Sequence, residues 1–267
     1  MAIIIPERYF HVPKAHRRPK EPSAKKLREL ASKWITNLRA SKTGREAERH
    51  ALADLLEACE PLRRCYSAAC PRCSAAAQRW AMEELADLWP EETDLVSMTM
   101  IVAKLHRPIG ELATIELSSI KRHLQRKFEA AEVSAIPIWG YIDISHNVHA
   151  DGLYDEHWAP HLAFVTLAGN ERDLDGLKAS LERNNSSKRP HRVDEVNDWD
   201  WQVSYVCKFR PARRVEFEKL TPRARPSKYW LQPAQTVEFL LWAGQRHPLD
   251  RFFLLGMRRY RDGLQLL

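Results

Sequence analysis

Four residues of the sequence have side chains that could break a phosphodiester bond if the fold brought them together. Asp143 and His161 each lie in an apolar run typical of a strand, and Lys208 follows Tyr205 by three positions. A tyrosine hydroxyl, with a pKa of about 10, needs a phosphate made more electrophilic, typically by Mg²⁺ or Mn²⁺. Asp143 and His161 could bind such an ion, and the Lys208 ammonium would favour the phenolate. The set predicts metal-dependent cleavage of DNA by a tyrosine.

Each of these residues also has a structural interpretation. Tyr205 could be a core aromatic residue, Asp143 a structural ion-pair partner, and His161 a buried histidine on an apolar strand. Because side chains alternate along a strand, Ala163 shares the face of His161. A second metal-binding histidine would be expected at that position. A methyl group cannot bind a metal, so Ala163 is the residue on which catalysis depends.

A second group of chemically distinctive residues consists of four cysteines within fifteen positions. Two of them form a Cys-Pro-Arg-Cys unit, in which both sulfurs can face one ion. Zinc is bound tetrahedrally by four ligands in structural sites. The spacing therefore predicts a structural zinc ion, with His50 as a substitute ligand if Cys59 or Cys65 points away. The predicted ligands are Cys59, Cys65, Cys70 and Cys73.

The charge distribution favours a polyanionic partner. The chain has 267 residues and a formal net charge of +7. Its basic residues gather near the N-terminus, after Tyr205 and near the C-terminus, and DNA is the expected partner. No apolar run reaches the roughly 20 residues that span a bilayer, so we expect no membrane partner and a cytoplasmic protein. Candidate DNA-binding residues are Arg210, Arg213, Arg214, Arg258, Arg259, Trp199 and Trp201, with Tyr229 as a further stacking residue.

Hydrophobic spacing predicts the elements that must position these side chains. Strands are expected at 95–102, 136–144 and 157–167, and helices at 23–39, 44–58, 74–88, 115–131, 173–184, 237–244 and 252–260. This order predicts an α+β fold with helices packed on one face of a mostly antiparallel sheet. The expected organisation is a basic extended arm (1–22), a helical segment with the cysteines (23–90), a nuclease-like domain (91–215) and a basic C-terminal helical region (216–267).

Four motifs occur in an order that resembles the replication-initiator branch of the HUH endonuclease superfamily, the rolling-circle plasmid and transposon initiators. The first motif is the cysteine segment, and the second is Val96-Ser97-Met98-Thr99-Met100. The third combines two strands, Tyr141-Ile142-Asp143-Ile144 and Trp158-Ala159-Pro160-His161-Leu162-Ala163. The fourth is Tyr205-Val206-Cys207-Lys208-Phe209. The resemblance implies an HUH-type fold, a divalent ion at Asp143 and His161, and a 5′-phosphotyrosine link at Tyr205 to single-stranded or hairpin origin DNA.

The family pattern has a second histidine where this chain has Ala163. Three explanations stay open. The protein has lost nicking and kept DNA binding, or a nearby histidine supplies the ligand, or histidine was deliberately replaced by alanine. The candidate substitutes are His146, His149 and His157, of which His149, in the loop between the strands, is favoured. Three functions follow: a tyrosine nickase, a zinc-stabilised DNA-binding protein without catalysis, or a protein-interaction module with zinc.

Overall fold

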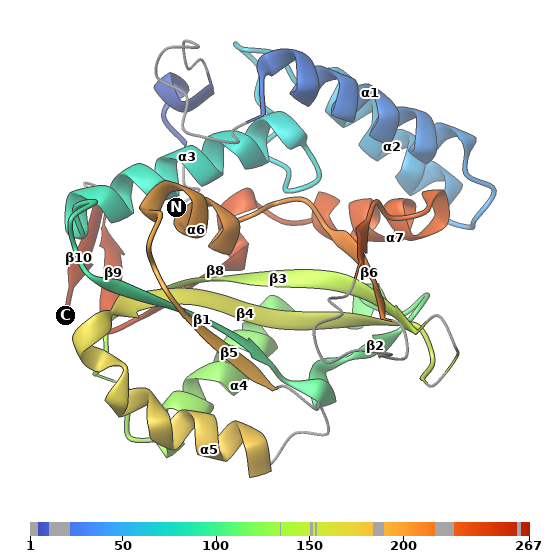
Figure 1. Ribbon diagram of the computed structural model, residues 1–267. Coiled ribbons are helices and arrows are strands. Elements are labelled where there is room, and N and C mark those ends of the chain that lie inside the picture. Colours follow the sequence, from blue (N-terminus) through green and yellow to red (C-terminus); the bar gives the residue numbers. More distant parts are fainter. Residues whose placement is uncertain are drawn as a thin grey trace.

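The computed structural model describes residues 5–10, 22–133, 135–149, 152, 154–183, 190–216, 227–260 and 263–267. Most of the predicted basic arm, residues 1–22, lies outside these ranges, as do the basic residues Lys219, Arg223, Arg225 and Arg261. The described part is α+β (Figure 1). Its α-helices are α1 (Ala24–Ala40), α2 (Glu46–Glu57), α3 (Pro71–Leu88), α4 (Leu117–Ala130), α5 (Asp175–Arg183), α6 (Trp199–Val206) and α7 (Pro233–Gly244).

An eight-stranded sheet forms the centre of the molecule, with the order β5-β1-β4-β3-β6-β7 and with β2 and β8 beside β4 and β3. A separate hairpin pairs β9 with β10. The strands are β1 (Leu95–Ile101), β2 (Arg107–Pro108), β3 (Ile138–His149), β4 (His157–Leu167), β5 (His191–Glu195), β6 (Ala212–Glu216), β7 (Ser227–Tyr229), β8 (Phe252–Leu255), β9 (Met257–Tyr260) and β10 (Gly263–Leu266).

The sheet is mixed and has helices on both faces, which corrects the expectation of helices on one face. β6 pairs with β3 in parallel, whereas β4 and β8 pair with β3 antiparallel. Helices α4 and α5 lie below the sheet in Figure 1, and α3 and α6 lie above it. Both faces of the central strands are therefore buried, and β3 and β4 are buried along most of their length.

The two faces of the sheet contribute to separate apolar clusters. Even-numbered side chains such as Met98, Ile142 and Phe164 pack with Phe128 of α4. Odd-numbered side chains such as Tyr141, Ala163 and Val165 belong to the cluster that includes residues of α3 and α6. The alternation along β3 and β4 thus places Asp143 and His161 on the side of α6, because both have odd numbers.

Two helices begin at residues whose side chains suit a helix start, although the observed bounds differ from the predicted ones by up to four residues. The Ser23 side chain accepts a hydrogen bond from the Lys26 backbone N–H and caps α1. Pro71 occupies the first turn of α3, where its missing N–H costs no hydrogen bond. Helices α1, α2 and α7 pack against one another and lie on the same side of the sheet as α3 and α6 (Figure 1).

The C-terminal region differs from the prediction. Residues 237–244 are helical within α7, but 252–260 form β8 and β9 instead of a helix. β8 adds to the sheet because Phe253 and Leu255 alternate with less buried neighbours and pair with β3. Gly256 then adopts a positive φ of 61°, which ends the strand and turns the chain into β9. No described helix is long and apolar enough to cross a membrane.

Candidate functional site

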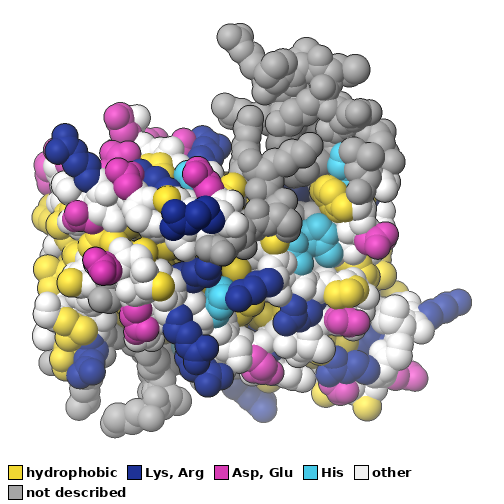
Figure 2. Space-filling view, turned by 90° about the horizontal axis from the view of Figure 1, so that it is seen from below, with side chains coloured by type: hydrophobic (Ala, Val, Ile, Leu, Met, Phe, Trp, Pro, Cys, Tyr) yellow, Lys and Arg dark blue, Asp and Glu magenta, His cyan; other side chains and the backbone are white. Residues whose placement is uncertain are grey.

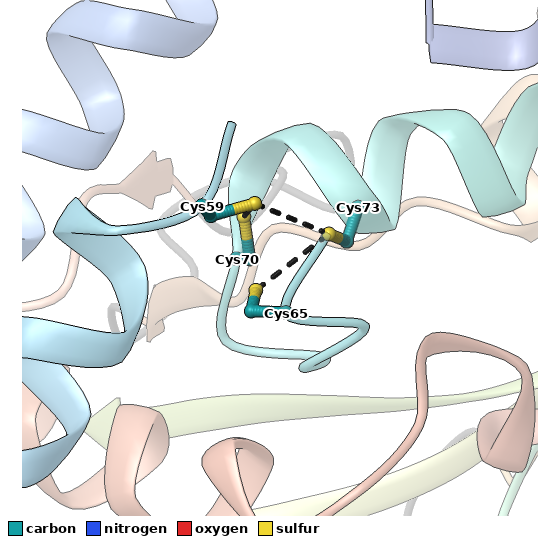
Figure 3. A group of neighbouring side chains, drawn as sticks. All are labelled: Cys59, Cys65, Cys70 and Cys73. Carbon is teal, nitrogen blue, oxygen red and sulfur yellow. Dashed lines mark hydrogen bonds between the residues drawn. The ribbon is translucent and has the colours of Figure 1, made fainter. Parts of the chain in front are cut away.

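The four predicted zinc ligands converge on one point beside the start of α3 (Figure 3). Cys59 follows α2, Cys65 lies in the connecting loop, Cys70 is the N-cap of α3, and Cys73 lies in its first turn. The sulfur of Cys73 is 3.7 Å from that of Cys59 and 3.6 Å from that of Cys65. The sulfurs of Cys70 and Cys59 are also 3.7 Å apart.

These distances fit a tetrahedral metal site. Four sulfurs each about 2.3 Å from a zinc ion lie about 3.8 Å from one another. All four sulfurs of this cluster are within 4.8 Å of one another, and three of the cysteines are buried. The positive end of the α3 dipole also favours thiolates at Cys70 and Cys73. The four cysteines can therefore hold a metal ion such as zinc, in a closed site without a position for water.

His50 is not part of this group. It lies on α2, 3.8 Å from the carboxylate of Glu46, and is not needed as a substitute ligand. Hydrogen bonds from Cys65, Cys70 and Cys73 lower the pKa of the Cys59 thiol, which favours its thiolate. The fifth cysteine, Cys207, is buried at the end of α6 and donates to the Val203 carbonyl oxygen.

Asp143 and His161 face each other across β3 and β4. They are register partners, and the Oδ2 atom of Asp143 is 3.1 Å from Nε2 of His161. Asp143 is 1% exposed. Its carboxylate also contacts Nζ of Lys208 and lies 3.3 Å from Nη2 of Arg251. Although burial opposes ionisation, the charges of Lys208 and Arg251 hold the pKa of Asp143 well below its usual range.

The histidine of this pair is neutral and presents a lone pair. Burial, followed by the charge of Arg214, lowers the pKa of His161 to about 4. Its Nδ1 atom lies 3.2 Å from the Ala159 carbonyl oxygen, to which it donates in the neutral ring. The Nε2 atom is then the acceptor of the ring, and Nη2 of Arg214 donates to it at 3.0 Å. The Asp143 carboxylate lies beside this hydrogen bond, with its Oδ2 atom 3.1 Å from Nε2.

Arg251 fills a break in the sheet beside this pair. β8 pairs with β3 up to Tyr141, and β6 pairs with β3 from Ser145 onward. In the gap, Nε of Arg251 donates to the Ile142 carbonyl oxygen at 2.8 Å. Its guanidinium also lies over the Tyr141 ring, 4.4 Å from the ring centroid. The buried arginine thus satisfies an open strand edge and a carboxylate together, and no sequence motif pointed to it.

Lys208 lies between the Asp143–His161 pair and Tyr205. Its Nζ atom lies 4.5 Å from the centroid of the Tyr205 ring while it contacts Asp143. Tyr205 lies on α6, and its ring stacks on Trp201 with 5.8 Å between centroids. Helix α6 ends at Val206, so Lys208 lies just after the helix that carries Tyr205. The structure brings Asp143, His161, Lys208 and Tyr205 into one cluster.

A divalent ion does not fit this cluster. Only two potential ligand atoms converge, one from Asp143 and one from His161, and three cationic side chains surround them. Within the described residues, the cysteines form the only group of three or more potential metal ligands that lie close together. Lys208, Arg214 and Arg251 supply the positive charge that an ion would bring.

None of the three substitute histidines lies beside Asp143. His146 faces the opposite side of β3 and is 2.9 Å from Oε2 of Glu156. His149 lies six residues along β3 from Asp143, about 20 Å away, and contacts Tyr154. His157 lies about 13 Å along β4 from His161 and stacks on His106. Ala163 is buried in the cluster that includes Val203 of α6.

The predicted DNA-binding residues are scattered over the molecule. Trp201 is 38% exposed, but Trp199 is only 7% exposed because it packs in the cluster that includes Trp139 and Val203. Trp199 therefore offers little surface for stacking in this structure, and its contact with DNA stays a prediction. Arg213 and Arg214 lie on β6 beside the acidic pair, and Arg210 lies just before β6. Arg258 is exposed on β9, and the side chain of Arg259 lies outside the described part.

A further basic surface was not predicted. Helix α4 carries Lys121, Arg122, Arg126 and Lys127, of which Arg122 and Arg126 are exposed. Figure 2 shows the molecule from the side of α4 and α5, with Lys and Arg side chains gathered across the middle of the face near histidines. A charged helix face is usually only solvated, so the sequence gave no reason to select it.

No protein-family model matches the sequence, and no curated protein or solved structure matches it.

Proposed function

We propose that this chain is a zinc-stabilised DNA-binding protein of the replication-initiator type that has no catalytic metal. One observation carries the proposal: Lys208 and Arg214 contact the atoms of Asp143 and His161 that would bind a catalytic ion. The acidic residue, strand histidine and Tyr-x-x-Lys motif of a nicking enzyme lie together, yet the position of the ion is taken by fixed cations. Such a site suits binding of a DNA phosphate better than its cleavage.

Three features around the cluster support DNA as the partner. Arg213 and Arg214 lie on β6 and Arg210 lies just before it, so three arginines occur within five positions next to the cluster. The stacked rings of Trp201 and Tyr205 offer an aromatic surface for bases. The net charge of +7 adds attraction to a polyanion. Single-stranded or hairpin origin DNA is the preferred form, because unpaired bases can reach the aromatic rings.

Nicking through Tyr205 is the second candidate, favoured by the position of Lys208 between Asp143 and the tyrosine ring. In this reaction the phenol loses its proton and its oxygen bonds to the phosphorus. The bond from phosphorus to the 3′ oxygen breaks, and that oxygen gains a proton. Lys208 would stabilise the phenolate before attack and the phosphotyrosine afterwards.

DNA binding is tested with labelled single-stranded, hairpin and duplex oligonucleotides, by fluorescence anisotropy at about 50 and 200 mM salt. We expect binding that weakens with salt, and Arg214→Met should weaken it further while lowering the salt slope by about 0.7–0.9. Arg192→Met is the matched control, because Arg192 is an exposed arginine on β5 paired with Asp194. Absence of binding to every DNA at the lower salt would reject the proposal.

Cleavage is tested by incubating the protein with single-stranded DNA plus Mn²⁺ or a chelator and looking for a covalent adduct by denaturing electrophoresis. The proposal predicts no adduct under either condition. An adduct that disappears in Tyr205→Phe would instead establish the nicking function. An adduct that persists in Tyr205→Phe would exclude Tyr205 as the nucleophile.

A further inference from the structure

Trp230 is an exposed tryptophan whose ring lies near two cationic side chains, one on α1 and one just before β6. It follows β7, and 56% of its surface is accessible. Nζ of Lys33, on α1, lies 5.4 Å from the centroid of the indole ring. The guanidinium carbon of Arg210 lies 5.8 Å from the same centroid. Tyr229, the preceding residue, is also exposed, at 51%.

Arg210 is a half-buried cation that pairs with no carboxylate of the described residues. Burial lowers the pKa of its guanidinium. Across the described ranges, neither Arg210 nor Lys33 forms an ion pair; their contacts there include aromatic rings. A desolvated, unpaired charge is unfavourable, and an anion placed beside it removes the cost. Arg210 therefore indicates an anionic ligand at this place.

A small hollow, with space for little more than a water molecule, adjoins the indole of Trp230. This pocket is lined by Lys33, Trp34, Pro211 and Phe239, among others, and most of its wall is apolar. A single exposed apolar residue is common on proteins and needs no explanation. An exposed indole beside an apolar pocket and an unpaired, half-buried arginine is a different case, since it combines a stacking surface with a site for negative charge.

The same place is continuous with the Asp143–His161 cluster. In the β6–β7 ladder, Tyr229 lies opposite Arg213, and the next residue of β6 is Arg214, which contacts His161. The edge of the sheet therefore leads from the cluster, across β6 and β7, to Trp230. A DNA strand held at Arg214 could continue over this edge.

We propose that Trp230, Lys33 and Arg210 form a subsite for one nucleotide of a single strand, which deepens and rests on the proposed DNA binding. The base stacks on the indole, next to the apolar pocket, and its phosphate lies between Lys33 and Arg210. In a duplex the bases are stacked on each other and cannot use the indole. The subsite therefore selects single-stranded over double-stranded DNA.

The test compares Trp230→Ala and Trp230→Phe in the full-length, zinc-loaded chain, using an oligothymidylate and a duplex of equal length. Trp230→Ala should weaken binding of the single strand about tenfold and leave duplex binding within about twofold, whereas Trp230→Phe retains most of the affinity. Tyr260→Ala is the matched control, because Tyr260 is another exposed aromatic residue, on β9. It should leave both affinities unchanged.

Two further measurements test the phosphate contact and the stacking. Arg210→Met should lower the slope of log affinity against log salt by about 0.7 for the single strand. An oligonucleotide with 5-iodouracil, irradiated in the complex, should cross-link to the peptide that contains Tyr229 and Trp230.

The possible failures are distinguishable. If the wild type binds no DNA at low salt, the proposed function and this subsite both fail. If the wild type binds and Trp230→Ala weakens single-stranded and duplex DNA equally, or neither, only the subsite is overturned. Cross-linking at other peptides alone would also overturn it. Binding of an acidic peptide that matches single-stranded DNA in affinity would assign the site to a protein partner and overturn the nucleotide subsite.

Discussion

The cysteine cluster and the Asp143–His161 cluster contain residue types that bind metals, but only one of them is arranged for a metal. At the cysteines, four sulfurs converge with spacings close to those of a tetrahedron. At Asp143, two ligand atoms converge and cationic side chains contact them. A group of potential ligands indicates a metal when no cationic side chain of the protein neutralises their negative charge. When fixed cations outnumber the carboxylate, as Lys208, Arg214 and Arg251 do at Asp143, the excess positive charge favours an anion instead of a metal.

The largest expected effect comes from removing zinc. Chelation, or Cys73→Ser, should destabilise the packing around the start of α3 by up to about 10 kcal/mol, because four thiolates without an ion cannot stay together. We expect about one zinc per chain by mass spectrometry, lost in Cys73→Ser. Cys207→Ser, a change at a buried cysteine outside the cluster, should keep the zinc and most of the stability. Purified protein that holds no metal and melts unchanged after chelation would contradict the assignment.

The second effect concerns the carboxylate at the centre of the cationic cluster. Asp143→Asn leaves Arg251 buried beside a neutral group and should lower the free energy of unfolding by about 3–5 kcal/mol in a denaturant titration. Asp194→Asn removes an exposed partner of Arg192 and should cost no more than about 1 kcal/mol. Equal losses of unfolding free energy in the two variants would show that Asp143 does not offset the charge of the buried Arg251.

The third effect is the pH dependence that His161 introduces. Its pKa is about 4 in the folded chain and about 6.5 when unfolded, so above pH 6.5 the ring is neutral in both states and contributes nothing. As pH falls from about 6.5 to 4, the unfolded chain binds the proton first, and stability falls by about 3 kcal/mol. His161→Gln should remove this part of the slope. An identical slope in the wild type and His161→Gln would contradict a buried, neutral ring.

The contrast between the two clusters also explains what could be predicted from the sequence. The cysteines were found because the four ligands are close in sequence, and Asp143 and His161 because each is a polar residue within an apolar run typical of a strand. Their pairing across β3 and β4 came only from the structure. Arg251 was missed because it lies 108 residues from Asp143, and no local pattern reports such a contact. Residues 252–260 were predicted helical because short apolar runs fit both periods, and only the open edge of β3 decides between them.

The smallest expected effect, a change of melting temperature on adding Mn²⁺, tests directly whether the Asp143–His161 cluster binds a metal as the cysteine cluster does. Added Mn²⁺ should not change the melting temperature of the zinc-loaded wild type, because Lys208 and Arg214 already contact Asp143 and His161. An ion present at ten times its dissociation constant would add about 1.4 kcal/mol, which thermal unfolding resolves. Lys208→Met removes one of these cations, so a small Mn²⁺-dependent rise is expected in that variant and not in Lys208→Met combined with Asp143→Asn. A rise in the wild type that Asp143→Asn abolishes would place a metal at this cluster after all, and the cations would then be its neighbours and not its replacement.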